Sequence, residues 1–369
     1  MMTVNGILIP IDKVKAGMVT SDSIIKLNES GQTVLAIKPN TELNKDAIER
    51  LYRHGIKQIP VKKPAGGIVI PSLGITVPPV KPIMDSAVKE KAISGVRNLF
   101  TLAESGTENM TTAYQAIKEL DHVVDQLVDT ISSADADVHI SDLKSYDEYT
   151  YHHSLSVAVL AIAIGKGMGF DSAMLKRLGH AAILHDIGKL LVPLEIINKP
   201  GKLTDEEFTT IQQHAEEGGN YFRNANIGDM ELWTAIAYHH EKINGGGYPR
   251  GLKGEEIPLL SRVISVADVY DALTSYRSYR KPMLPAHAVE IIMGEVGKSF
   301  FYDVVSTFLE SIKLYPINTV LELSDKRQGV VIDNTNSMRP ILRMLDDGST
   351  LDLLGKDNLS LMVTVVMDE

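Results

Sequence analysis

The histidines of this chain are concentrated in one part of the sequence. Eight of the eleven lie between residues 139 and 240, and His185 is followed directly by Asp186 inside the apolar stretch 181–191. Burial of a carboxylate is costly unless the group is paired or bound to a metal. Imidazole and carboxylate groups suit iron, manganese, nickel, cobalt or zinc, and a chain without cysteine offers no thiolate. We therefore expect a metal site built from histidine and aspartate.

Two pairs of residues leave a choice of ligand open. Asp268 and Asp271 both lie in the apolar stretch 262–273. One can bind metal while the other pairs nearby, and the pattern does not say which. His152 and His153 are adjacent at the start of a predicted apolar helix over residues 154–165. Successive helical residues point about 100° apart, so both cannot face one metal.

Lys189 indicates a second kind of chemistry at the same place. It follows His185 by four residues, on the same face of a helix predicted to run through both. A cation beside a metal is repelled unless an anion lies between them. The spacing therefore points to a phosphate group as the anion. His180 lies on another face of this helix and is predicted to be structural.

The segment 239–249 combines ligand-type residues with a chain that cannot be helical. His239, His240 and Glu241 run into glycines at 245–247, followed by Tyr248 and Pro249. Glycine and proline both disfavour a helix interior, so the histidine pair stands at the end of an element. His214 lies in a polar stretch and, taken by itself, reads as a surface residue.

Taken together, these residues resemble the HD-GYP family of bacterial phosphodiesterases that cleave cyclic di-GMP. The resemblance covers roughly residues 145 to 325. It rests on residues 149–154, His185-Asp186 with Lys189, His214, residues 239–241 and 245–251, residues 254–258, Arg262 and residues 268–275. The segments before and after also look like those that accompany this domain.

The resemblance implies roles for particular residues. The implied metal ligands are His153, His185, Asp186, His214, His239, His240 and Asp268. The implied substrate contacts are Lys189, Gly247, Tyr248, Arg277 and Arg280, with Pro249 completing the signature. The glycines would let the backbone approach a nucleotide, and Tyr248 would border a guanine.

The implied reaction is a hydrolysis assisted by two divalent ions. Asp186 would bridge the ions and Lys189 would neutralise phosphate charge, so we assign both as catalytic. The expected product is pGpG, followed by GMP if a second cut occurs. Iron or manganese is preferred, with nickel and zinc open. A third ion is disfavoured because Tyr149 occupies the position of its glutamate and Glu148 is one step away.

Three alternatives remain. One is a phosphodiesterase for another cyclic dinucleotide such as cyclic GMP-AMP. Another is a catalytically silent receptor for cyclic di-GMP or an interaction module, which the full ligand set disfavours. The third is an oxygenase with a mixed-valence di-iron pair in a similar helical fold, which leaves the Gly-Tyr-Pro loop unexplained.

The sequence pattern around these residues predicts a mainly α-helical protein with small β-containing ends. We expect an α/β module over residues 1–61, a Pro/Gly-rich linker over 62–82 and a helical connector over 83–144. The catalytic domain of the HD type, a helical bundle, would occupy residues 145–315, and a β-rich appendix residues 316–369. Strands are expected at 6–9, 33–37, 56–61, 319–323, 329–332, 340–344 and 361–366, with a helix over 44–54.

Composition limits the partners and the location. The net charge of −10 over 369 residues argues against binding DNA or RNA. No apolar run reaches the length of a membrane span, and the absence of cysteine is typical of a reducing compartment. We therefore expect a cytoplasmic protein without a membrane partner. Cyclic di-GMP is the expected ligand, and a homodimer and other bacterial signalling proteins stay open as partners.

Overall fold

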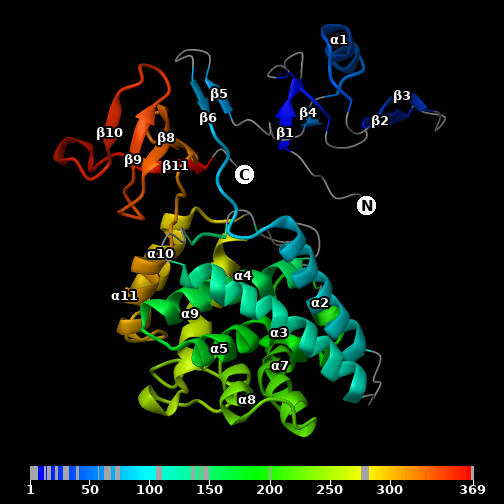
Figure 1. Ribbon diagram of the computed structural model, residues 1–369, viewed down its shortest axis with the longest axis vertical. Helices are drawn as coiled ribbons and strands as arrows, with labels where there is room; N and C mark the ends of the chain where they lie inside the picture. The colour runs from blue at the N-terminus through cyan, green and yellow to red at the C-terminus, as the bar shows by residue number, and fades with distance from the viewer. Residues whose placement is uncertain are drawn as a thin grey trace.

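The computed structural model describes most of the chain. The described residues are 7–11, 14, 18–20, 24–27, 33–38, 41–56, 58–61, 68–70, 75–104, 110–133, 138–140, 143, 149–197, 199, 201–275 and 282–366. Figure 1 shows a bundle of helices with short N-terminal strands and a C-terminal sheet at one end of it. The fold is mainly α-helical with small β-containing ends, in agreement with the prediction.

The N-terminal module has its own small core. Strand β1 (Ile7–Pro10) pairs with β4 (Gln58–Val61), and β2 (Ile24–Leu27) pairs with β3 (Thr33–Ile37), both antiparallel. Helix α1 (Lys45–Arg53) is capped by the Asn44 side chain. The apolar side chains that meet inside are Val14, Ile24, Leu43, Leu51 and Ile59. Strand β2 was not predicted, because polar residues flank its four residues closely.

The proline-rich segment 62–82 contains regular structure that the sequence did not predict. Strand β5 (Ile68–Ile70) pairs antiparallel with β6 (Ile75–Val77). Branched side chains at these positions favour extended backbone, although each strand has only three residues. The sequence predicted a Pro/Gly-rich linker here, and the structure adds this short hairpin to the described part of the segment.

Two long helices connect the N-terminal strands to the remaining bundle. The predicted helical connector over 83–144 contains two helices, α2 (Ser86–Glu104) and α3 (Met110–Ser132). The bundle continues with α4 (Tyr149–Gly167), α5 (Ser172–Leu184), α6 (Leu194–Ile197), α7 (Asp205–Asn224), α8 (Met230–Ala237), α9 (Leu259–Thr274), α10 (Pro285–Gly294) and α11 (Tyr302–Ser311).

Helix α4 is the central element of the bundle. Every residue from 153 to 165 is buried, and α4 packs against α5, α9 and α11. A helix that is apolar on all sides is stable only when other elements surround it. Because α4 begins four residues before His153, this histidine lies inside the first turns of the helix, within the core.

The helix predicted through His185 and Lys189 is interrupted. Helix α5 ends at Leu184, and the 3₁₀ helix η2 (Ile187–Leu191) follows Asp186. A Cβ atom on Gly188 would lie 2.0 Å from the backbone oxygen of His214, so η2 and α7 meet backbone to backbone at this glycine. Lys189 therefore does not share one α-helical face with His185, and the predicted i, i+4 relation is wrong.

The C-terminal strands form one antiparallel sheet in the order β10-β9-β8-β7-β11. Its strands are β7 (Val320–Leu323), β8 (Gln328–Asp333), β9 (Ile341–Met344), β10 (Thr350–Asp352) and β11 (Val363–Val366). Leu321, Val331 and Leu342 belong to the same apolar core as the helices. The sheet is therefore packed on the bundle, and β10 is an additional strand that the sequence pattern did not indicate.

Candidate metal centre

Three histidines of the predicted site orient their rings by the same local hydrogen bond. The Nδ1 atoms of His185, His214 and His239 lie 2.7, 2.6 and 2.6 Å from the carbonyl oxygen three residues earlier in the chain. A carbonyl oxygen only accepts hydrogen bonds, so each Nδ1 carries the proton and each Nε2 presents a lone pair. This is the orientation that a metal-binding histidine requires.

His153 is oriented by a carboxylate instead of a carbonyl. Its Nδ1 lies 2.7 Å from Oδ2 of Asp271, which is itself buried and accepts a hydrogen bond of 3.0 Å from the Ser275 hydroxyl. On the other side of the ring, Nε2 of His153 lies 3.2 Å from Oδ1 of Asp268. The structure thus separates the two aspartates of α9. Asp268 faces the centre, and Asp271 lies behind His153.

Asp186 lies between two groups of side chains and turns one oxygen towards each. Its Oδ2 lies 3.7 Å from Nε2 of His153 and 3.5 Å from Nε2 of His185. Its Oδ1 lies 3.4 Å from Nε2 of His214. Candidate ligand atoms lie within 4.8 Å of one another in the sets His153, His185, Asp268 and His214, His239, His240. A carboxylate placed in this way can bridge two cations.

The electrostatics keep most of the ligand atoms in their metal-binding form. Burial lowers the pKa of His185, of His214 and of His239, so that these rings are neutral at pH 7. Burial acts to raise the pKa of Asp186, but Lys189 and the surrounding imidazoles hold that pKa well below its usual range. The centre therefore offers neutral nitrogen and anionic oxygen.

His153 behaves differently from the other histidines. Burial acts to lower its pKa, but the hydrogen bonds with Asp268 and Asp271 outweigh burial and raise the pKa to about 9. A proton between Nε2 of His153 and Asp268 occupies the position where a cation would bind. Metal and proton therefore compete at this nitrogen.

The unsatisfied atoms of the centre fit a divalent metal. The Nε2 atoms of His185, His214 and His239 and Oδ1 of Asp186 are buried and make no hydrogen bond with any described residue. An unpaired buried polar group costs about 1–3 kcal/mol. In addition, Nε2 of His214 and Oδ1 of Asp186 direct lone pairs at each other, and two acceptors attract only through a cation. Nitrogen and oxygen donors of this kind suit a divalent transition metal.

Lys189 lies at the edge of the centre. Its Nζ is 2.5 Å from Oδ2 of Asp186, while 33 % of its side chain is exposed to solvent. The ammonium group is therefore held beside the carboxylate and remains accessible to an incoming anion. This contact follows from the 3₁₀ turn, which brings residues three apart onto the same side.

Glu241 organises the loop that follows the histidine pair, a role that the sequence did not predict. Its side chain is buried, and Oε1 accepts hydrogen bonds from the backbone N–H groups of Arg250 and Gly251 at 2.7 and 3.1 Å. Oε2 accepts from the N–H of Leu252 at 3.0 Å. The carboxylate thus fastens the far end of the loop to the residue after His240. The sequence feature that could have indicated this role is an acidic residue that directly follows the ligand pair and precedes a glycine-rich loop.

Gly247 and Tyr248 lie next to this clamp. A Cβ atom on Gly247 would lie 2.4 Å from the nitrogen of Lys242, so this glycine allows the loop to fold against itself. Its predicted role beside a nucleotide stays a prediction. The Tyr248 ring lies 4.7 Å from the His240 ring with an interplanar angle of 35°, and 6.5 Å from the Phe208 ring. The aromatic rings thus extend from the centre towards the surface.

The structure brings all seven predicted ligands together from five parts of the chain. His153 comes from α4, His185 and Asp186 from the junction of α5 and η2, His214 from α7, His239 and His240 from the end of α8, and Asp268 from α9. The polar neighbours of His214 in the sequence predicted a surface position. That prediction is wrong, because His214 is 1 % exposed. The predicted contacts Arg277 and Arg280, and Glu148, lie outside the described residues.

Comparisons with known proteins agree with this arrangement. The model of the HD domain family matches residues 137–304. A cyclic di-GMP phosphodiesterase of Pseudomonas aeruginosa is 32 % identical over 302 residues, which cover 79 % of this chain and 71 % of that protein. A 3′3′-cGAMP-specific phosphodiesterase of Vibrio cholerae is 40 % identical over 159 residues, covering 43 % of this chain and 36 % of that protein.

A solved structure supports the same fold. An HDGYP protein from Bdellovibrio bacteriovorus superposes with a TM-score of 0.51 at 17 % identity, covering 82 % of this chain and 97 % of that one. The helical bundle and its histidine–aspartate centre define a hydrolase of the HD-domain class. Within that class, the chain belongs to the HD-GYP family.

In the parts of the chain that the structure describes, no helix combines the length and the apolar character that crossing a bilayer demands.

Proposed function

We propose that this chain hydrolyses cyclic di-GMP with the help of two divalent metal ions. The observation that carries the proposal is the position of Asp186, whose two oxygens face two separate groups of ligands, with Lys189 beside it. Relatives named as cyclic di-GMP phosphodiesterases support this substrate.

The ligands divide between the two ions according to their distances. His153, His185, Asp268 and Oδ2 of Asp186 would hold one ion, and His214, His239, His240 and Oδ1 of Asp186 would hold the other. When bound, such ions supply Lewis acidity, which stabilises phosphate charge and makes water a competent nucleophile near neutral pH. Iron is the preferred identity for this donor set, with manganese, nickel and zinc as alternatives.

The remaining chemistry belongs to the side chains around the ions. Lys189 neutralises charge on the phosphate oxygens as phosphorus is attacked, because its partly exposed ammonium group lies at the edge of the centre. Tyr248 borders a base beside His240, with Gly247 and Pro249 shaping the loop. Arg277 and Arg280 are proposed as further contacts to phosphate or guanine.

The product would be pGpG, and GMP after a second cut. A second candidate substrate is cyclic GMP-AMP, since several relatives are named as specific for it. Parallel turnover of the two dinucleotides by the same metal-loaded protein separates these substrates.

The experiment that tests the proposed site pairs two substitutions. Asp186→Ala removes the shared ligand and should abolish both metal content and turnover of cyclic di-GMP. Lys189→Ala should retain metal, because Lys189 is not a ligand, and should lower kcat by about a hundredfold. Metal content is measured by elemental analysis and products by chromatography.

Each outcome has a clear consequence. Unchanged turnover in Asp186→Ala refutes the assigned centre. Loss of metal in Lys189→Ala refutes the phosphate role. An absence of turnover in fully loaded wild-type protein that still binds cyclic di-GMP supports a receptor instead of an enzyme.

A further inference from the structure

His153 is held in its orientation by a different kind of contact from three other imidazoles of the centre. The Nδ1 protons of His185, His214 and His239 go to backbone carbonyl oxygens three residues earlier in the chain. Those carbonyls are present whatever the surrounding side chains are. The Nδ1 of His153 lies 2.7 Å from Oδ2 of Asp271 instead. One ligand of the centre therefore depends on a side chain that is not itself a ligand.

The Asp271 carboxylate is engaged through both of its oxygens. Asp271 is fully buried, with Oδ2 towards His153 and Oδ1 accepting a hydrogen bond of 3.0 Å from the Ser275 hydroxyl. Ser275 is also buried, and it stands one turn further along, at the end of α9. Because rotation of the carboxylate would disturb both contacts, its direction is fixed, and with it the direction of the His153 ring.

The position of the remaining proton decides whether the His153 ring can bind a cation. A neutral imidazole carries one proton, and only the other nitrogen presents a lone pair. A carboxylate accepts hydrogen bonds and does not donate them, so Asp271 keeps the proton on Nδ1. The Nε2 atom then faces Asp268 and Asp186, at 3.2 and 3.7 Å. A carboxylate partner of this kind also makes the ligand nitrogen more basic.

The influence of Asp271 is confined to one of the two groups of ligands. His153, His185 and Asp268 form the first, which we call the His153 group. The second, the His214 group, consists of His214, His239 and His240. Neither side-chain hydrogen bond of Asp271 involves a member of the His214 group. A change at residue 271 should therefore act on one ion position and spare the other.

We propose that Asp271 is a positioning residue for the ion of the His153 group alone. It fixes the ring and the tautomer of His153, and its negative charge strengthens Nε2 as a donor. The inference rests on the proposed two-ion centre and deepens it. It implies that one substitution outside the ligand set separates the two ions.

The first test removes the acceptor while keeping a side chain of similar volume. Metal-free, full-length Asp271→Leu is titrated with Mn²⁺ in competition with a chelator. One of the two affinities should fall by about 10–100-fold, the range known for outer partners of metal ligands, and the other should stay as in wild-type. At intermediate Mn²⁺ concentration, electron paramagnetic resonance should show an isolated ion in the variant and a coupled pair in wild-type.

The second test separates the charge of Asp271 from its geometry. In Asp271→Asn the amide oxygen can accept the Nδ1 proton of His153 while the amide NH₂ donates to Ser275, because a hydroxyl also accepts hydrogen bonds. The tautomer is then preserved and only the charge is lost. The affinity of the His153 group for Mn²⁺ should lie between those of wild-type and Asp271→Leu.

The third test makes the tautomer itself visible. Ser275→Ala alone should keep an affinity close to wild-type, because the Asp271 carboxylate still accepts from His153. In Asp271→Asn/Ser275→Ala the amide is free to turn its NH₂ towards His153, which moves the proton to Nε2 and blocks the cation. We expect this double variant to bind about tenfold more weakly than Asp271→Asn, a coupling between neighbours that independent structural losses would not give.

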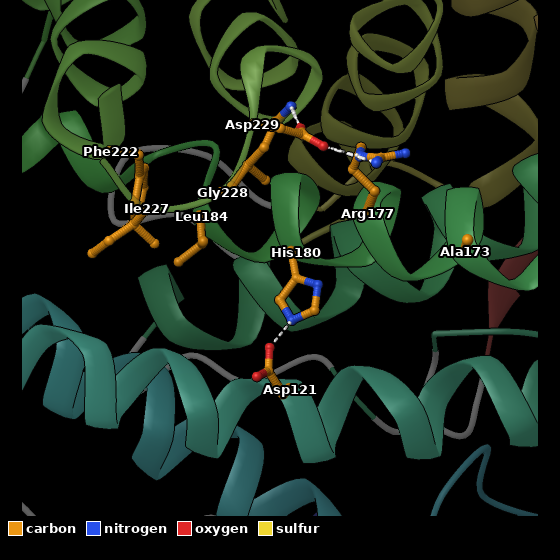
Figure 2. A pocket seen from close by; sticks show the side chains of 10 residues that line it. Asp121, Ala173, Arg177, His180, Leu184, Phe222, Ile227, Gly228 and Asp229 are labelled. Carbon is orange, nitrogen blue, oxygen red and sulfur yellow. Dashed lines mark hydrogen bonds and ion pairs between the residues drawn. The ribbon is translucent and has the colours of Figure 1, made fainter. Parts of the chain in front are cut away.

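Asp121→Asn is the matched control, because it also replaces an aspartate that pairs with a histidine. Oδ1 of Asp121 lies 2.8 Å from Nε2 of His180, and the dashed line in Figure 2 marks this pair between α3 and α5. His180 is not a ligand of the centre. Both Mn²⁺ affinities should therefore match those of wild-type.

The outcomes distinguish this inference from the proposed function. Two ions bound with wild-type affinity in Asp271→Leu, or both weakened equally, overturn the positioning role. Additive effects of Asp271→Asn and Ser275→Ala overturn the role in the tautomer. If Asp271→Leu does not fold, the Asn and Ala variants decide alone. Wild-type protein that binds fewer than two Mn²⁺ ions refutes the two-ion centre itself, and the separation of its positions with it.

Discussion

At the scale of single residues, the centre depends on how each ligand atom is kept in the required protonation state. Backbone carbonyls hold the proton on Nδ1 of His185, His214 and His239, so that Nε2 is available. His153 is the exception, because two aspartates stabilise its protonated form. This difference leads to a pH dependence that can be measured without substrate.

We expect metal-stripped protein to lose stability between about pH 7.5 and pH 9, because below this range the buried neutral histidines of the centre contribute the opposite pH dependence. The pKa of His153 is raised from 6.5 to about 9 in the folded state, so folding takes up a proton there. The resulting stabilisation, about 3 kcal/mol, is complete below pH 6.5 and is lost as the pH rises through 9. Urea unfolding of chelator-treated protein measures it.

His153→Gln should remove most of this pH dependence. The control is His180→Gln, which changes a histidine that pairs with Asp121 outside the centre and should leave the dependence intact. A wild-type stability that stays level or increases across this interval contradicts the assigned environment of His153.

Glu241 is expected to act as a positioning residue for the loop. Glu241→Ala leaves the N–H groups of Arg250, Gly251 and Leu252 without their partner. Because hydrogen bonds to a charged group contribute about 1.5–3 kcal/mol, we expect KM for cyclic di-GMP to rise by about tenfold or more. Steady-state kinetics at full metal loading measures the change.

Two further variants make this prediction specific. Glu241→Gln keeps the shape and part of the acceptor capacity, so its KM should lie between those of wild-type and Glu241→Ala. Glu217→Ala, at an exposed position of α7, should behave as wild-type. If Glu241→Ala changed only global stability and left KM unaltered, the positioning role would be refuted.

At the scale of elements, the contact between η2 and α7 brings Asp186 close to His214. Gly188 allows it, since a Cβ atom there would lie 2.0 Å from the His214 oxygen and 2.7 Å from the Gly218 nitrogen. Both obstacles are backbone atoms, which cannot rotate away as a flexible side chain can.

Gly188→Ala should therefore separate the two elements. We expect a destabilisation of about 3 kcal/mol or more, together with weaker metal binding, because Asp186 and His214 move apart. Thermal unfolding and metal titration measure the two effects. Gly294→Ala is the matched control: a Cβ atom there meets nothing within 4 Å, so its stability should stay the same or rise slightly.

At the scale of the whole molecule, the two β-containing ends relate differently to the bundle. The five core residues of the N-terminal module form a cluster of their own. The C-terminal sheet instead shares the core of the helices, through Leu321, Val331 and Leu342. Fully buried Tyr315 lies where the sheet begins. Figure 1 shows the C-terminal strands next to α10 and α11.

Truncation at either end should consequently have unequal effects. Removal of residues 1–78 should leave the bundle folded and able to bind metal, because none of the described residues in this part belongs to the core of the bundle. Removal of residues 316–369 exposes part of the shared core and should lower Tm markedly. Circular dichroism and metal analysis measure both. Unfolding of the first variant, or an unchanged Tm in the second, contradicts the assignment of the cores.

Much of the site was predictable because its chemistry follows from the types of residue in the motifs. A histidine–aspartate pair in an apolar stretch indicates a metal, and the motif order indicates the family. Helix α9 was predictable for a similar reason, since apolar residues surround Asp268 and Asp271. The hairpin β5–β6 and strand β10 were not, because three-residue strands depend on pairing more than on local preference.

The sequence by itself determined the donor atoms of the centre and most of the helices that carry them, because both follow from side-chain chemistry and hydrophobic periodicity. Only the tertiary structure decided that Asp271 orients His153, that the 3₁₀ helix η2 separates Lys189 from the helix before His185, and that Glu241 fastens the loop. The physical reason is that these contacts join residues that are distant in the chain, or residues that a turn brings together. Their distances are set by the packing of η2, α7 and α9 around α4, which no local pattern specifies.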